Sequence, residues 1–154
     1  MLGDCTMFAE YDVEVGDEES HEHLVDLYRR RSRNALTRAM RDLEAGDYDG
    51  AVFDAEQAVQ LYLKSIILEY TDATPRTHNL RKLLQVVGEL LGASNEFKEF
   101  IKANKYKLHT LEDAYYSSRY LPKEFSKEDA EELVKFAEEV IKFVESRKAS
   151  KASH

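Results

Sequence analysis

The sequence lacks several features on which whole protein classes depend. Cys5 is the only cysteine among the 154 residues, which excludes an intramolecular disulfide and favours an intracellular compartment. The longest apolar runs, such as Ile66-Ile67-Leu68, fall far short of the roughly 20 residues of a membrane span. Because Gly3-Asp4 and Glu10 interrupt any apolar start, we expect no signal peptide, no membrane association and a cytoplasmic protein.

Positive charge is also scarce over the chain as a whole. Lysine and arginine total 22 against 30 aspartate and glutamate residues, so the net charge is −8. This balance argues against non-specific binding of nucleic acid or membranes. No cluster of histidine, aspartate and glutamate has the spacing of metal ligands, so we predict no metal and no cofactor. The length is that of one domain.

Apolar residues at helical spacing are what the sequence has in abundance. The segment 48–71 is apolar on two faces, and a helix with two apolar faces must contact more than one neighbour. We therefore predict that it is the central, most buried helix of a bundle, with small alanines that let partner helices approach. Its two apolar lines are Ala51, Ala55, Ala58, Tyr62 and Ile66, and Val52, Val59, Leu63, Ile67 and Tyr70.

Four further helices are predicted around it. They cover residues 21–45 after a Ser20 cap, a stretch from 77 or 78 to 91, residues 94–118, and a stretch from a capping box at Ser126 to about 145. Short connections then give an all-α, antiparallel up-and-down bundle of four or five helices. We expect residues 1–20 to form a poorly ordered arm, 21–147 the bundle, and 148–154 a frayed tail. Met7–Val15 alternates like a strand but has no evident partner.

Four pieces of the sequence resemble the HEPN domain family, named for higher eukaryotes and prokaryotes nucleotide-binding. Together they cover roughly residues 33–145. The four pieces are Asp42-Leu43-Glu44-Ala45-Gly46-Asp47-Tyr48-Asp49-Gly50-Ala51, Glu56-Gln57-Ala58-Val59-Gln60-Leu61-Tyr62-Leu63-Lys64, Thr77-His78-Asn79-Leu80-Arg81-Lys82-Leu83-Leu84, and Asp113-Ala114-Tyr115-Tyr116-Ser117-Ser118-Arg119-Tyr120-Leu121-Pro122.

The resemblance implies a four- or five-helix bundle and a homodimer. It also implies a minimal nucleotidyltransferase as partner, since many members act with one as a toxin–antitoxin pair. Some members are metal-independent ribonucleases with an Arg-x4–6-His motif, in which the arginine steadies phosphate and the histidine transfers protons. Both residues must lie beside one phosphate for that chemistry.

Arg119 is the arginine of the fourth piece, but no histidine follows it at the required spacing. This departure argues against ribonuclease activity. Arg119 remains a candidate for phosphate contact, and Tyr115, Tyr116 and Tyr120 are candidates for stacking on a base. The structural alternatives are a salt bridge that ends the helix and tyrosine rings that pack in the core.

Histidine and arginine supply the other candidates. His78, at the expected start of a helix, is placed to contact an anion or simply to cap or pack. Six arginines without an intervening acid crowd one expected helix, and two of them, Arg29 and Arg33, lie near its apolar stripe, where they would reach a groove for phosphate, RNA or an acidic partner. The alternative is a solvated face paired with acids of the last helix. The arginines are Arg29, Arg30, Arg31, Arg33, Arg38 and Arg41, and the acids are Glu131, Glu138 and Glu145.

The favoured hypothesis is a non-catalytic or weakly catalytic helical protein that binds a nucleotide or RNA, or a nucleotidyltransferase partner. The alternatives are a ribonuclease toxin with a variant site around Arg119, and a plain helical scaffold.

Overall fold

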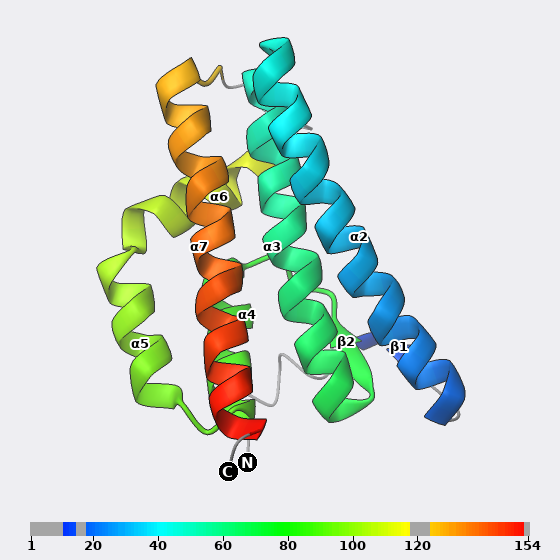
Figure 1. Cartoon of the computed structure of the whole chain (residues 1–154). Coiled ribbons are helices and arrows are strands. Elements are labelled where there is room, and N and C mark those ends of the chain that lie inside the picture. The colour runs from blue at the N-terminus through cyan, green and yellow to red at the C-terminus, as the bar shows by residue number, and fades with distance from the viewer. Residues whose placement is uncertain (1–10, 15–17, 118–123, 153–154) are drawn as a thin grey trace.

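A computed structural model describes residues 11–14, 18–117 and 124–152, and helices dominate it (Figure 1). Three long helices, α2 (Glu18–Ala45), α3 (Tyr48–Thr71) and α7 (Lys127–Ala152), run side by side. Three shorter helices, α4 (Leu80–Leu90), α5 (Ser94–Ala103) and α6 (Lys105–Ser117), pack to one side of them. The prediction of an all-α helical bundle is confirmed.

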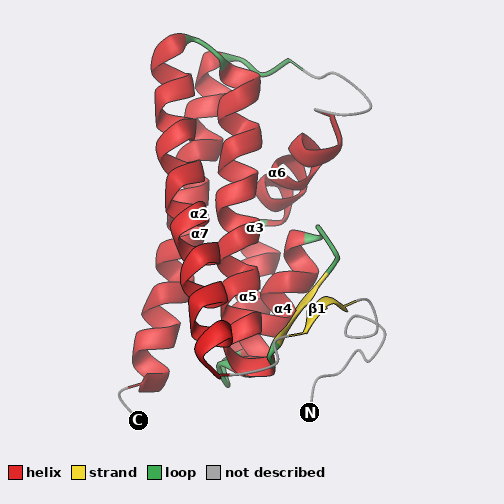
Figure 2. Ribbon diagram, turned by 90° about the vertical axis from the view of Figure 1, so that its right-hand side faces the viewer, coloured by secondary structure: helices red, strands yellow, loops and turns green. Residues whose placement is uncertain are grey.

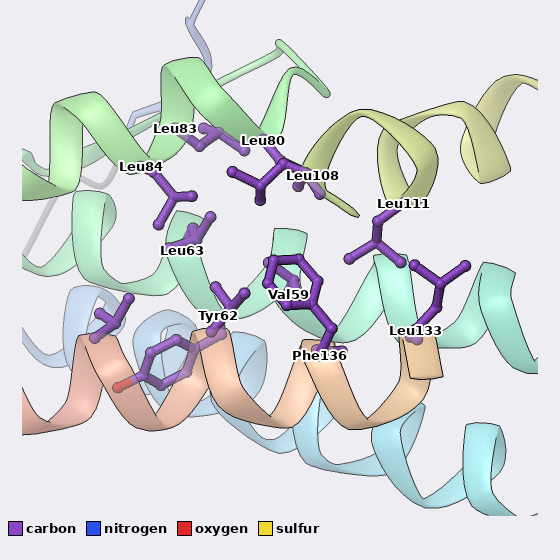
Figure 3. Close-up of a cluster of buried hydrophobic side chains, with 14 of the residues drawn as sticks. Val59, Tyr62, Leu63, Leu80, Leu83, Leu84, Leu108, Leu111, Leu133 and Phe136 are labelled. Carbon is purple, nitrogen blue, oxygen red and sulfur yellow. The ribbon is translucent and has the colours of Figure 1, made fainter. Parts of the chain in front are cut away.

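Helix α3 is the central element, as its two apolar faces predict. It contacts α2, α4, α6 and α7. The alanines Ala51, Ala55 and Ala58 are fully buried, and so are Leu63 and Ile67 on its other faces. Figure 3 shows how leucines from α4 and α6 meet the α3 side chains while α7 closes the core from the other side. Burial on every side explains why a single amphipathic stripe cannot describe this helix.

Several helix boundaries lie where turn and cap residues predict them. Gly46 has a φ of +78°, the left-handed conformation that glycine adopts after a helix, and it begins the turn between α2 and α3. The Asp47 side chain then accepts a hydrogen bond from the Gly50 N–H at 3.0 Å. At α7 the Ser126 hydroxyl accepts one from the Asp129 N–H at 3.1 Å. These caps satisfy N–H groups that have no partner within the helix.

The prediction of one helix over 94–118 is wrong, because the segment forms two helices that meet at Asn104. The Asn104 side-chain amide donates to the Phe100 carbonyl at 2.9 Å. A short amide side chain that bonds its own backbone competes with the helical ladder, so the chain turns here. The break allows α5 and α6 to cover different parts of the core.

Two predicted helix starts are also corrected. The helix expected at Thr77 or His78 begins at Leu80, because Asn79 is its N-cap and accepts from the Lys82 N–H at 3.1 Å. His78 therefore lies in the connection before α4 rather than on the helix. Helix α2 begins at Glu18, so Ser20 lies within it and is not its cap.

The N-terminal segment has a strand partner that its sequence does not reveal. Strand β1 (Tyr11–Glu14) pairs antiparallel with β2 (Ala73–Pro75), and Val13 lies opposite Thr74. Figure 2 shows this two-stranded sheet beside α4. The pattern at Thr74-Pro75 predicts only a loop, and β2 has three residues, too few for alternation to be visible.

Helix α7 continues to Ala152, past the residue where a frayed tail is expected. Its last turns are held by contacts to other helices. Lys151 donates to the Leu90 carbonyl at 2.5 Å, and its ammonium lies 4.9 Å from the centre of the Tyr70 ring. None of the described helices is both long and apolar enough to cross a membrane.

Candidate functional site

A chain of buried polar side chains crosses one face of α3. Glu56 is fully buried and Gln60 is 4% exposed, on a helix otherwise surrounded by apolar side chains. The Gln60 side-chain N–H donates to Glu56 at 2.8 Å, and Gln57 donates to the other Glu56 oxygen at 2.8 Å. On its other side, the Gln60 carbonyl accepts from the Lys64 ammonium at 3.1 Å. One side chain therefore links a buried carboxyl to a cation.

His78 completes this chain, and the hydrogen bonds determine which of its nitrogens carries the proton. The His78 Nδ1 lies 2.8 Å from the carbonyl oxygen of Gln60. That oxygen can only accept, because the amide nitrogen of Gln60 already donates to Glu56. His78 Nδ1 must therefore donate, and the neutral ring carries its lone pair on Nε2, the atom that would accept a proton.

Tyr115 of α6 lies flat against the ring of His78. The ring centroids are 4.1 Å apart and the planes differ by 20°. Tyr116 meets Tyr115 edge-on at 5.4 Å and is itself 52% exposed. The fold thus brings together three of the candidates from the sequence. We call Glu56, Gln60, Lys64, His78 and Tyr115 the Gln60–His78 cluster.

Two other candidates, Arg119 and Tyr120, lie outside the described residues. Helix α6 ends at Ser117. In the sequence, Arg119 follows Tyr115 by four residues.

Burial raises the pKa of Glu56 to about 7, from an ordinary value of 4.5. The hydrogen bonds from Gln60 and Gln57 and the charge of Lys64 oppose this rise, while the negative charge of Glu112 adds to it. Removal from water outweighs the donors because a buried carboxylate loses most of its hydration. Glu56 therefore changes protonation near neutral pH.

An ion pair borders the cluster at the start of α4. Glu112, which is 8% exposed, accepts from the Arg81 backbone N–H at 3.2 Å and from its guanidinium Nε at 3.4 Å. The Arg81 side chain is about one-third exposed. A guanidinium held by a buried carboxylate has a fixed orientation, so Arg81 is a second positioned cation on this side of the bundle.

The sequence pattern missed Gln60 and Glu112 and gave no reason to choose Glu56 or Lys64. The signal that could have identified them was a line of polar residues on a helix that is otherwise apolar. Glu56, Gln60 and Lys64 recur at four-residue spacing on a helix that is apolar on the other sides. Four-residue spacing puts side chains on one face, and a polar line on a central helix has to find buried partners.

Arg29 and Arg33 lie elsewhere, in a groove between α2 and α7 that is floored by α3. Gln60 and Tyr62 are two residues apart on α3, about 200° around the helix, so this groove and the Gln60–His78 cluster occupy opposite faces. We call it the α2–α7 groove. It has a volume of about 400 Å³, and its lining is Arg29, Ser32, Arg33, Leu36, Tyr62, Ile141, Glu145, Lys148 and Ala149.

The acids that pair with the α2 arginines come from α3 rather than from the last helix. Arg29 forms an ion pair with Glu69, and Arg38 forms one with Asp54 at 3.6 Å. The alternative that paired them with acids of the last helix is therefore wrong for these two residues. The physical reason is that α2 packs along α3 for most of its length (Figure 1).

A second carboxyl with a raised pKa lies at the far end of the α2–α3 pair. The pKa of Asp42 rises from 3.8 to about 7 because of burial, a hydrogen bond with Asp54 and the nearby charges of Asp54 and Asp47, while Arg38 lowers it. Among the residues that the structure describes, no group of three or more histidine, cysteine, aspartate or glutamate side chains is arranged to hold a metal ion.

Comparison with known proteins gives one match. The family model of the HEPN domain matches residues 25–147, which include α3 to α6, all but the first turns of α2 and most of α7. No curated protein and no solved structure matches the chain.

Proposed function

Since residues 25–147 match its model, the chain belongs to the HEPN domain family, and we propose that it is a nucleotide-binding module whose ligand contacts Tyr116, which packs against Tyr115 of the Gln60–His78 cluster. The observation that carries this proposal is the stack of His78 on Tyr115, four residues before Arg119. Aromatic and imidazole rings stack on bases, and arginine binds phosphate through paired N–H groups. Tyr115, Tyr116 and Arg119 lie within five residues of the chain, and the fold adds the imidazole of His78.

The exposed ring of Tyr116 provides the first stacking surface for a base, because about half of it faces solvent. Tyr115 is held in place by His78 and supports Tyr116 from the side. Arg119 and Tyr120 then follow in sequence, and we assign the phosphate to Arg119. Base stacking of this kind contributes about 1–3 kcal/mol per base.

Binding without efficient cleavage is the activity that this residue set supports best. No histidine follows Arg119 at the spacing of the family's nuclease motif. Losing a general base costs about 10²–10⁴ in rate. Tyr120 is a poor substitute because the unperturbed pKa of tyrosine is about 10.

One observation favours a second candidate, a ribonuclease with a variant site. The fold supplies a histidine from a different segment, since His78 contacts Tyr115 close to Arg119 in the chain. Its Nδ1 hydrogen bond to Gln60 leaves Nε2 as the basic nitrogen. In this candidate His78 takes the proton that the downstream histidine takes in the family's nucleases.

We further propose that the protein is a homodimer and the partner of a minimal nucleotidyltransferase, as half of a toxin–antitoxin pair. Family membership supports both statements. Light scattering at tens of micromolar tests the first, and a monomer mass would contradict it. Co-expression with a nucleotidyltransferase encoded beside its gene tests the second, and separate elution of the two proteins would contradict it.

Fluorescence anisotropy with a short labelled single-stranded RNA tests the binding proposal. The variant Tyr116→Ala removes the exposed ring, and Tyr106→Ala is its matched control because Tyr106 is an exposed tyrosine of the same helix, 83% accessible. We expect Tyr116→Ala to weaken binding about 5- to 100-fold, as loss of one stacked base implies, and Tyr106→Ala to change it less than twofold. Equal effects of the two substitutions would contradict the site.

A further inference from the structure

The α2–α7 groove is an open pocket that the proposed function does not use. Helices α2 and α7 diverge toward the start of α2 and the end of α7, and α3 lies between them (Figure 1). The volume of about 400 Å³ falls in the range of about 300–1,000 Å³ that is usual for small-molecule sites. The groove spans two turns of α2, from Arg29 to Leu36. Its size suits a small ligand rather than a protein segment.

Three cations line this groove on a chain whose net charge is −8. Two of them are held in place, since Arg29 and Lys148 both pair with Glu69, the latter at 3.6 Å. The third, Arg33, is exposed, and within the described part of the chain its guanidinium forms no hydrogen bond or ion pair. Glu69 offsets one of the three positive charges, and the two that remain attract an anion with several acceptor oxygens.

The floor of the groove is apolar apart from the hydroxyls of Tyr62 and Ser32. Leu36 of α2 and Ile141 of α7 line the groove together with Tyr62, whose side chain extends from α3 toward α7 (Figure 3). Burial raises the pKa of Tyr62 to about 12, so its hydroxyl stays protonated and can donate. Ser32 is already engaged, because its hydroxyl donates to the Ala58 carbonyl at 2.6 Å. The floor thus accepts a flat or aliphatic body, and the hydroxyl adds a donor.

We propose that the α2–α7 groove binds an organic phosphate, with the phosphate at Arg33, Arg29 and Lys148 and an apolar body on Tyr62, Leu36 and Ile141. A phosphate suits the site because it offers three acceptor oxygens and up to two negative charges to three cationic side chains, one of whose charges Glu69 already offsets. Glu145 also lines the groove and would repel a second anionic group elsewhere on the ligand. The ligand is therefore anionic at one end only. The inference is independent of the proposed function, since the two sites occupy opposite faces of α3.

Isothermal titration calorimetry of the full chain with phenyl phosphate tests the inference. Inorganic phosphate, hexyl phosphate and adenosine monophosphate are separate arms that distinguish the bare anion, an aliphatic body and a nucleoside body. We expect phenyl phosphate to bind and inorganic phosphate to bind at least tenfold more weakly, because the apolar body is absent. No binding of any of the three organic phosphates, or equal binding of inorganic and organic phosphates, would overturn the inference.

Matched arginine variants locate the site. Arg33→Gln removes the unpaired guanidinium, and Arg31→Gln is its control, an exposed arginine of the same helix outside the groove lining. Both variants change the net charge equally and leave the core intact. We expect about tenfold weaker phenyl phosphate binding in Arg33→Gln, as loss of a charged hydrogen bond implies, and less than twofold change in Arg31→Gln. Equal weakening in both would overturn the site, while RNA binding at Tyr116 would still stand.

Discussion

The ring of His78 lies flat on the ring of Tyr115, with centroids 4.1 Å apart and planes 20° apart. This contact ties the connection before α4 to the end of α6, two segments that belong to different pieces of the sequence motif. It also orients the imidazole, whose Nδ1 reaches Gln60 on α3. Stack and hydrogen bond together give the site one defined geometry before any ligand arrives.

The first expectation concerns the tautomer of His78. Because Gln60 presents a carbonyl oxygen to Nδ1, the neutral ring should carry its proton on Nδ1. Histidine ¹⁵N chemical shifts, with His78 assigned through a His78→Gln variant, measure this directly. A neutral ring protonated on Nε2 would contradict the orientation that we assign to the Gln60 amide.

Glu56 should make stability depend on pH near neutrality. Its folded-state pKa of about 7 exceeds the ordinary 4.5, so its contribution is fully present below about pH 4.5 and is lost as pH rises through 7. We expect Tm to fall by a few degrees between pH 5 and pH 8, since about 1 kcal/mol moves Tm by about 2–4 °C at this size. Glu56→Gln should reduce that fall.

Thermal melts by circular dichroism at several pH values check this expectation. Glu131→Gln on the exposed face of α7 is the control, because it removes the same charge without touching α3. Asp42 has a raised pKa as well, so part of the pH dependence should survive in Glu56→Gln. The same slope in Glu56→Gln and the wild type would refute the role of Glu56.

Ala58→Glu should destabilise the bundle severely. Ala58 is fully buried on α3, and its carbonyl accepts the Ser32 hydrogen bond against α2. A carboxylate there would be unpaired and desolvated, at a cost of several kcal/mol. The same change at the exposed Ala45 should have little effect. Urea denaturation measures the stability of both variants. A wild-type midpoint for Ala58→Glu would contradict the placement of Ala58 in the core.

Gly88→Ala should disrupt the contact between α4 and α5. A methyl group at Gly88 would meet the Cβ of Phe97 at 2.7 Å, and Phe97 is 1% exposed and cannot easily withdraw. Overpacking of this kind costs about 1–3 kcal/mol. Gln85→Ala, at an exposed position of the same helix, is the control. If Gly88→Ala were as stable as Gln85→Ala, the close packing of Gly88 against Phe97 would be contradicted.

Periodicity predicts long helices well because burial repeats along each helix. The two apolar lines of α3 and the turn at Gly46 follow directly from the residues. The break at Asn104 was missed because the apolar stripe continues across it, while one local hydrogen bond decides the geometry. The pairing of β1 with β2 depends on contacts between distant segments, which no local pattern reports.

The sequence identifies the aromatic and imidazole side chains of the candidate site, but not the buried residues that are hydrogen-bonded to them. His78, Tyr115 and Tyr116 are conspicuous residue types within recognised pieces of sequence, and the fold brings them together. Glu56 and Gln60 look like ordinary surface residues until the fold buries them. Arg29 and Arg33 line a groove on the face of α3 opposite the Gln60–His78 cluster.

One measurement tests the central claim, nucleotide binding without efficient cleavage, most directly. Labelled single-stranded RNA is incubated with the protein, with and without EDTA, and each sample is read by anisotropy and then on a denaturing gel. We expect anisotropy to rise, the RNA to stay intact in both samples, and Arg119→Ala to weaken binding. Absence of binding, or EDTA-insensitive cleavage that disappears in Arg119→Ala, would contradict the account.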